Sequence, residues 1–133
     1  MPTLKTILRR LVLAIKVLIV DDAVFMRNMI KDIFSGDEFA VVGEAANGVE
    51  AIEKYMELKP DVVTMDIVMP LKSGIEAVRD IVAEDAGAKI VMCSALGQDS
   101  LIMEAIEAGA KDFIVKPFKA EKVIEVVKRI VAD

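Results

Sequence analysis

The chain contains no histidine and a single cysteine. A zinc–histidine site, a Ser-His-Asp triad and a phosphohistidine within this chain are therefore excluded. Cys93 lies in the apolar run Ile90–Cys93 and has no partner for an internal disulfide, which fits a buried small residue in a protein of the reducing cytoplasm. Proline and glycine are scarce, so little disorder is expected beyond the ends. No apolar run approaches the roughly 20 residues of a membrane span.

Apolar residues, by contrast, make up 55% of the 133 positions. This length and composition predict one domain with a well-filled core. The net charge of -5 and the pI of about 4.8 argue against nonspecific nucleic-acid binding. The charge is uneven, because residues 1–16 contain four cations and no acid, while the remaining 117 residues carry -9.

Residues 1–15 are predicted to form an amphipathic extension of a domain that spans 16–133. Apolar residues recur there at helical spacing, at Leu4, Ile7, Leu8, Leu11, Val12 and Ile15. Cations occupy the polar face, at Lys5, Arg9 and Arg10. Three interpretations stay open: a helix that docks on the domain or on a second copy of it, a helix that binds a membrane surface or a partner, and a segment created by an early start codon or by cloning. A cleaved signal peptide is disfavoured, because Lys16 interrupts the apolar stretch.

From Lys16 onward, apolar runs typical of strands alternate with helical stripes. The run Val17–Val20 is apolar at every position, which indicates a strand covered on both faces. The expected strands are 16–20, 40–42, 62–65, 89–93 and 113–115. Five strands alternating with five helices predict an α/β fold, a doubly wound parallel sheet with helices on both faces. Gly109 is expected to end the fourth of these helices.

Charged residues follow several of the predicted strands. The set consists of Asp21 and Asp22 after the first strand, Asp66 after the third and Lys116 after the fifth. Parallel strands end together at one edge of a sheet, where ligands bind. Crowded carboxylates repel one another unless a cation offsets their charge, and Mg²⁺ prefers carboxylate, water and phosphate oxygens. The set therefore predicts a metal and phosphoryl site.

Each of these residues also has a plainer interpretation. An Asp-Asp pair after a strand can cap the next helix, and a lysine at a strand end is usually solvated. Ser94 ends the fourth strand and can cap its own loop. Pro117 restricts the backbone of Lys116 and permits a cis bond there.

Four segments resemble the receiver domain of two-component response regulators, in the order and spacing of that family. They are Val17–Asp22, Met65–Pro70, Cys93–Ala95 and Ala108–Phe118. The resemblance covers residues 16–131 and is nearest to the stand-alone chemotaxis members. It implies a flavodoxin-like sheet with the strand order 2-1-3-4-5. It also implies Mg²⁺ as cofactor and a phosphohistidine on a separate kinase as phosphoryl donor.

The same resemblance implies roles for the individual residues. Asp66 would be the phosphoacceptor. Asp22 and Asp66 would bind Mg²⁺ together with the backbone carbonyl of Val68, and Asp21 would act directly or through water. The resemblance implies three further roles: Lys116 would contact the phosphoryl group, Ser94 would bond to a phosphoryl oxygen, and Phe113 would stand at an aromatic switch position. Ser94 and Phe113 would together change the face formed by the fourth helix, fifth strand and fifth helix of the domain.

Some positions depart from the family pattern. The loop 71–74 lacks the common acid or Asn before its glycine, and Phe113 replaces a common tyrosine. Val68 and Leu96 are apolar where the family often has polar groups that place the hydrolytic water. These two residues predict slow intrinsic dephosphorylation.

The expected output is binding, because no DNA-binding or enzymatic region follows the last helix. The expected partners are the kinase, a flagellar motor switch or adaptor protein, and a phosphatase. A receiver of a non-chemotaxis pathway or phosphorelay is the nearest alternative. An aspartate-nucleophile phosphatase would need an acid at Val68, and a flavodoxin would need a Ser- and Thr-rich loop where Asp21 and Asp22 stand. A degenerate receiver that serves only as a scaffold fits poorly, because all reactive positions are filled.

Overall fold

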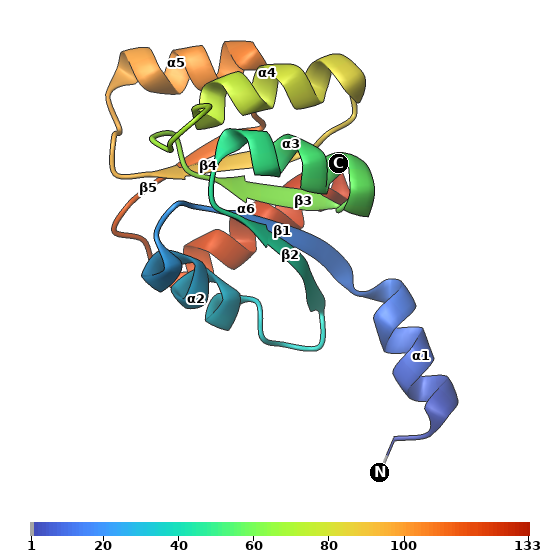
Figure 1. Cartoon of the computed structure of the whole chain (residues 1–133). Coiled ribbons are helices and arrows are strands. Elements are labelled where there is room, and N and C mark those ends of the chain that lie inside the picture. Colours follow the sequence, from blue (N-terminus) through green and yellow to red (C-terminus); the bar gives the residue numbers. More distant parts are fainter. Residues whose placement is uncertain (1) are drawn as a thin grey trace.

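A computed structural model describes the backbone of residues 2–133 and the side chains of residues 2–8 and 13–133. Its centre is a five-stranded parallel sheet in the order β2-β1-β3-β4-β5 (Figure 1). The strands are β1 Ile15–Val20, β2 Phe39–Ala45, β3 Val62–Met65, β4 Ile90–Ser94 and β5 Asp112–Val115. The predicted doubly wound parallel sheet and its flavodoxin-like order are confirmed.

Helices cover both faces of the sheet, and one further helix precedes β1 at the N-terminus. They are α1 Leu4–Leu13, α2 Val24–Ile33, α3 Gly48–Leu58, α4 Gly74–Glu84, α5 Asp99–Ala108 and α6 Ala120–Ala132. Helices α3, α4 and α5 pack on one face, and α2 and α6 pack on the other (Figure 1). The layering follows from the right-handedness of the crossovers. The crossover from β1 to β2 runs one way along the sheet and the later crossovers run the other way, so α2 lies on the opposite face from α3, α4 and α5.

The two core layers are supplied by alternate residues of the same strands. In β1, Leu18 and Val20 face α3 to α5, while Val17 and Ile19 face α2 and α6. All four side chains are buried. A strand with helices on both sides needs apolar residues at every position, which is why the continuous run in the sequence predicted this strand correctly.

Strand β2 is longer than the sequence predicted. It spans Phe39–Ala45 instead of 40–42, and its pairing with β1 shifts register between Val17 and Leu18. Gly43 and Glu44 interrupt the apolar pattern, but backbone hydrogen bonding to β1 carries the strand through them. An edge strand is paired on one side and half-exposed, so its side chains show a weaker hydrophobic signal.

Helix α4 begins in close contact with the end of β3. The side chain of Ser73 accepts a hydrogen bond from the backbone of Glu76, whose side chain accepts one from Ser73 in return. The backbone N–H of Gly74 donates to the carbonyl of Ile67 at 2.8 Å. A Cβ at Gly74 would lie 1.8 Å from the carbonyl oxygen of Asp66, so only glycine fits. Gly109, at φ 120°, ends α5 as predicted.

Helix α1 projects away from the sheet (Figure 1). Its predicted apolar residues Leu4 and Leu8 are 72% and 53% exposed, and Leu13 is 69% exposed. Ile7 lines a cavity of about 280 Å³ together with Phe39. The predictions for Arg9, Arg10, Leu11 and Val12 fall on side chains outside the described residues. Within residues 2–133, every helix is too short or too polar to cross a bilayer.

Candidate functional site

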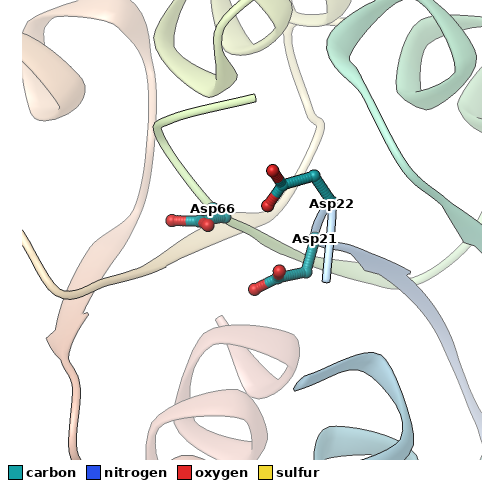
Figure 2. Close-up of side chains that lie close together, drawn as sticks. All are labelled: Asp21, Asp22 and Asp66. Carbon is teal, nitrogen blue, oxygen red and sulfur yellow. The ribbon is translucent and has the colours of Figure 1, made fainter. Parts of the chain in front are cut away.

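Three carboxylates meet where β1 and β3 end (Figure 2). One oxygen from each of Asp21, Asp22 and Asp66 lies within 4.8 Å of the others. The pairing of the two strands fixes this arrangement, since the backbone N–H of Asp66 donates to the carbonyl of Val20 at 3.0 Å. Asp21 is buried, Asp66 is half-buried and Asp22 is exposed. The cluster is therefore open to solvent on the side of Asp22.

Lys116 brings an ammonium to the same cluster from the end of β5. Its Nζ lies 2.8 Å from Oδ2 of Asp21 and 3.6 Å from Oδ2 of Asp66. The Lys116–Pro117 peptide bond is cis. The side chain is 14% exposed, so the ammonium is held in the site and is not a solvated surface charge. Asp21 also accepts a hydrogen bond from the backbone of Ala23 at 2.9 Å.

The charges in this site oppose one another. Burial raises the pKa of Asp66, the Lys116 ammonium counteracts that rise, and the negative charge of Asp21 adds to it. For Lys116, burial lowers the pKa, but the hydrogen bond to Asp21 and the charge of Asp66 outweigh it, so the net shift is upward. One ammonium faces three carboxylates, and these hard oxygen donors suit a small dication such as Mg²⁺.

Ser94 lies beside the cluster but makes a different contact from the one the family resemblance implies. Its side chain is buried at the end of β4, and its Oγ accepts a hydrogen bond from the backbone N–H of Leu96 at 3.2 Å. This is the loop-capping role considered above. The backbone carbonyl of Ser94 accepts a bond from the N–H of Lys116 at 2.9 Å, which ties the two strand ends together.

The other predicted residues lie on the loop after Asp66 and on β5. Val68 is 60% exposed on the loop after Asp66. Phe113 is half-buried on β5 and packs against the core on the α3 to α5 side. In the unusual 71–74 loop, Leu71 has a φ of 68° and is exposed, and Lys72 forms an ion pair with Asp80.

Sequence reasoning missed one contact at the site. Arg27 of α2 donates from Nη1 to the backbone carbonyl of Asp21 at 2.7 Å and from Nε to Glu44 of β2 at 3.1 Å. The sequence does not show which backbone carbonyl a side chain will bind. The available signal was a cation on a predicted helix shortly after two acids, which also fits an ordinary surface residue.

Comparison with known proteins settles the family. The profile of the response regulator receiver domain matches residues 17–128. The chain belongs to the response regulator receiver family. Receiver proteins similar to it include the chemotaxis protein CheY of Thermotoga maritima, 57% identical over 86% of this chain and 96% of that protein. The chemotaxis protein CheY of Bacillus subtilis is 57% identical over 88% of this chain and 98% of its own length.

Solved receiver structures agree with the fold. The chain resembles a chain of the CheX-CheY-BeF3-Mg²⁺ complex from Borrelia burgdorferi with a TM-score of 0.83 and 40% identity, over 86% of this chain and 87% of that one. It resembles the response regulator domain of Thermotoga maritima CheB with a TM-score of 0.84 and 40% identity, over 90% and 98%. The chain is thus a signalling domain of the CheY-like receiver type.

Proposed function

We propose that this protein is a stand-alone response regulator of a chemotaxis pathway, which accepts a phosphoryl group on Asp66 in the cytoplasm. The observation that carries the proposal is the convergence of Asp66 with two further carboxylates and the Lys116 ammonium. The lengths of the CheY relatives support the stand-alone assignment, because the chain covers 96% and 98% of them. The sequence predicted a domain of residues 16–133 after an extension of residues 1–15; since Ile15 already pairs with Phe39 in the sheet, we propose that the domain begins one residue earlier.

In the proposed reaction, an oxygen of Asp66 attacks the phosphorus of a phosphohistidine on the kinase. An O–P bond forms while the N–P bond breaks, and the imidazole keeps the bonding electrons. Phosphoryl transfer depends on positioning and on neutralising charge on the transferred oxygens. Lys116, 3.6 Å from Asp66, is placed to pair with one of those oxygens.

The three carboxylates fit a metal that assists this transfer. Asp22, Asp66 and the backbone carbonyl of Val68 would hold Mg²⁺, with Asp21 acting directly or through water. The ion, when bound, supplies positive charge to the carboxylates and the phosphoryl oxygens. Asp21 has a second task, because its Oδ2 fixes the Lys116 ammonium at 2.8 Å.

The proposed output is a shift between two conformations. The hydroxyl of Ser94 would leave the N–H of Leu96 and bond to a phosphoryl oxygen, and Phe113 would move into the vacated space. The face of α5, β5 and α6, where Met103, Ile106 and Val115 are exposed, would then change shape. Reversing a 1:99 population to 99:1 needs about 5.5 kcal/mol, much of which charge-assisted hydrogen bonds to the phosphoryl group can supply.

The proposed partners follow from this cycle. A histidine kinase supplies the phosphoryl group, and a flagellar motor switch or adaptor protein binds the altered face. A phosphatase is a third partner, and the structure of a related CheY in complex with CheX supports the idea that such regulators engage further proteins. A non-chemotaxis receiver would use the same chemistry with a different output protein.

Residues 1–15 are proposed to pair two copies of the chain. The apolar side chains of Leu4 and Leu8 are exposed on α1, and the cationic first 16 residues contrast with the -9 charge of the rest. Light scattering on the full chain and on a form that begins at Lys16 tests this idea. A dimer that needs the segment supports it, whereas a monomeric full chain contradicts it.

Phosphorylation is tested with acetyl phosphate or phosphoramidate in the presence of Mg²⁺, followed by intact mass. We expect a single phosphoryl adduct that Asp66→Asn abolishes. Asp99→Asn, an acid on the exposed start of α5, is the matched control and should keep the adduct. An adduct that survives Asp66→Asn would overturn the assignment, and steady turnover of phosphate esters would indicate an aspartate-nucleophile phosphatase instead.

Slow intrinsic dephosphorylation is proposed from two apolar side chains beside the site. Val68 is 60% exposed and Leu96 is 37% exposed. Both side chains are apolar, so neither offers a polar group to an attacking water. We expect Val68→Asn to shorten the lifetime of the phosphorylated protein, and Leu71→Asn, on the same loop, to leave it unchanged. A wild-type half-life of seconds would contradict the proposal.

A further inference from the structure

Arg27 links the carboxylate cluster to the edge of the sheet. The Arg27 side chain is 15% exposed, and its guanidinium bridges two elements, donating to the carbonyl of Asp21 at 2.7 Å and to Oε1 of Glu44 at 3.1 Å. The other oxygen of Glu44 lies 2.6 Å from Nζ of Lys31. Arg27 and Lys31 of α2 thus both bind the carboxylate of Glu44 in β2. Arg27 also binds the backbone at the end of β1.

The acceptor atom is important because it belongs to the peptide that joins the two acids. A peptide unit is planar and contains both flanking Cα atoms. A hydrogen bond to the carbonyl of Asp21 therefore orients the Cα of Asp22 as well. Asp22 is the exposed member of the cluster. Side-chain hydrogen bonds hold Asp21 and also Asp66, whose Oδ1 accepts from the backbone N–H of Ile67 at 2.8 Å, but among the described residues none holds Asp22.

We infer that Arg27 is a positioning residue for the metal, which holds the Asp21–Asp22 peptide so that both carboxylates face Asp66. This inference rests on the proposed function of the site. Removing a residue that orients metal ligands through hydrogen bonds commonly lowers metal affinity by about 10–100-fold. Arginine suits the task better than lysine, because its planar fork donates in two directions at once.

The test compares Arg27→Met with Arg27→Lys and a matched control. Arg79→Met removes an arginine of α4 that pairs with Glu104 at 3.6 Å on the surface, away from the carboxylates. Calorimetric titration with Mg²⁺ gives the Kd of each protein, and circular dichroism gives its melting temperature. We expect Arg27→Met to raise the Mg²⁺ Kd about tenfold, Arg27→Lys to have a smaller effect, and Arg79→Met to leave the Kd unchanged.

Phosphorylation by acetyl phosphate provides a second readout. Because Arg27 acts through the metal loop and touches no transferred atom, the Arg27→Met defect should appear at low Mg²⁺ and disappear at saturating Mg²⁺. A merely structural role would instead lower the melting temperature and leave the Mg²⁺ Kd unchanged.

The outcomes separate this inference from the proposed function. If the wild-type protein neither binds Mg²⁺ nor forms an adduct at Asp66, the proposed function fails. If the wild type does both and folded Arg27→Met binds Mg²⁺ like the wild type, the positioning role alone is overturned. Should Arg27→Met fail to fold, Arg27→Lys decides: a raised Kd at an unchanged melting temperature supports the role, and an unchanged Kd refutes it.

Discussion

Replacing Lys116 by methionine removes the cation that pairs with the buried carboxylate of Asp21. The side chain of Asp21 is 2% exposed and lies 2.8 Å from the ammonium, while Asp66 lies 3.6 Å from it. Methionine keeps much of the aliphatic stem but leaves Asp21 buried and unpaired. Breaking a buried ion pair in this way costs about 3–5 kcal/mol. Since Lys116 is itself 14% exposed, we expect about 3 kcal/mol, at the lower end of that range.

Urea and thermal unfolding at neutral pH without Mg²⁺ measure this loss. For a chain of this size, about 3 kcal/mol corresponds to a fall in melting temperature on the order of 10 °C. Lys128→Met is the matched control, because its partner Glu38 is 61% exposed and such surface pairs contribute at most about 1 kcal/mol. Asp21→Asn combined with Lys116→Met should recover part of the loss, because asparagine needs no counter-charge.

Mg²⁺ adds a second arm to the same experiment. We expect the ion to raise the melting temperature of Lys116→Met more than that of the wild type, because it would replace the missing positive charge among the three carboxylates. A Lys116→Met protein that loses no more stability than Lys128→Met would refute the reasoning, since it would mean that the buried carboxylate does not depend on its ammonium.

Three further predictions concern residues around the core. Burial raises the pKa of the Cys93 thiol to about 12, so thiol reagents should modify it at about pH 8 only at the rate of unfolding; fast modification of the native protein would contradict this. The hydroxyl of Thr64 is fully buried without a hydrogen-bond partner among the described residues, so Thr64→Val should raise the free energy of unfolding by about 1 kcal/mol, and a loss in urea titration would disprove it. Hydrogen bonding from Lys31, together with its charge and that of Arg27, lowers the pKa of Glu44 against the effect of burial. The folded pKa is therefore below the unfolded one, and this contribution to stability is complete above the unfolded pKa and is lost as the pH falls through the folded pKa. Glu44→Gln should weaken the dependence of the free energy of unfolding on pH in the acidic range. An unchanged dependence would contradict this prediction.

The sequence predicted those parts of the fold that depend on side-chain burial. The apolar run of β1 identified a doubly covered strand, and Gly109 identified the end of α5. The extent of β2 was missed, because backbone pairing carries Gly43 and Glu44 through the strand without an apolar signal. The strand order followed from the family resemblance, since hydrophobic periodicity does not specify which strands are neighbours.

The site shows the same division. The acids and the lysine could be placed together in advance, because parallel strands end at a common edge. The hydrogen-bond partner of each polar atom could not be predicted in the same way. The hydroxyl of Ser94 bonds to the backbone of Leu96, and Arg27 bonds to the backbone of Asp21, and such acceptors and donors are present at nearly every residue. Loop geometry decides which of them is used.

The bond between Lys116 and Asp21 spans 95 residues of chain, from the first strand to the last. During synthesis the ribosome releases the acidic residues long before Lys116 has been added. A nascent chain therefore carries the carboxylates of the site without the ammonium that neutralises them. Contacts of such long range form late in folding. The proposed site would then be complete only after β5 and Lys116 have been synthesised, and a product truncated before Lys116 would lack the ammonium.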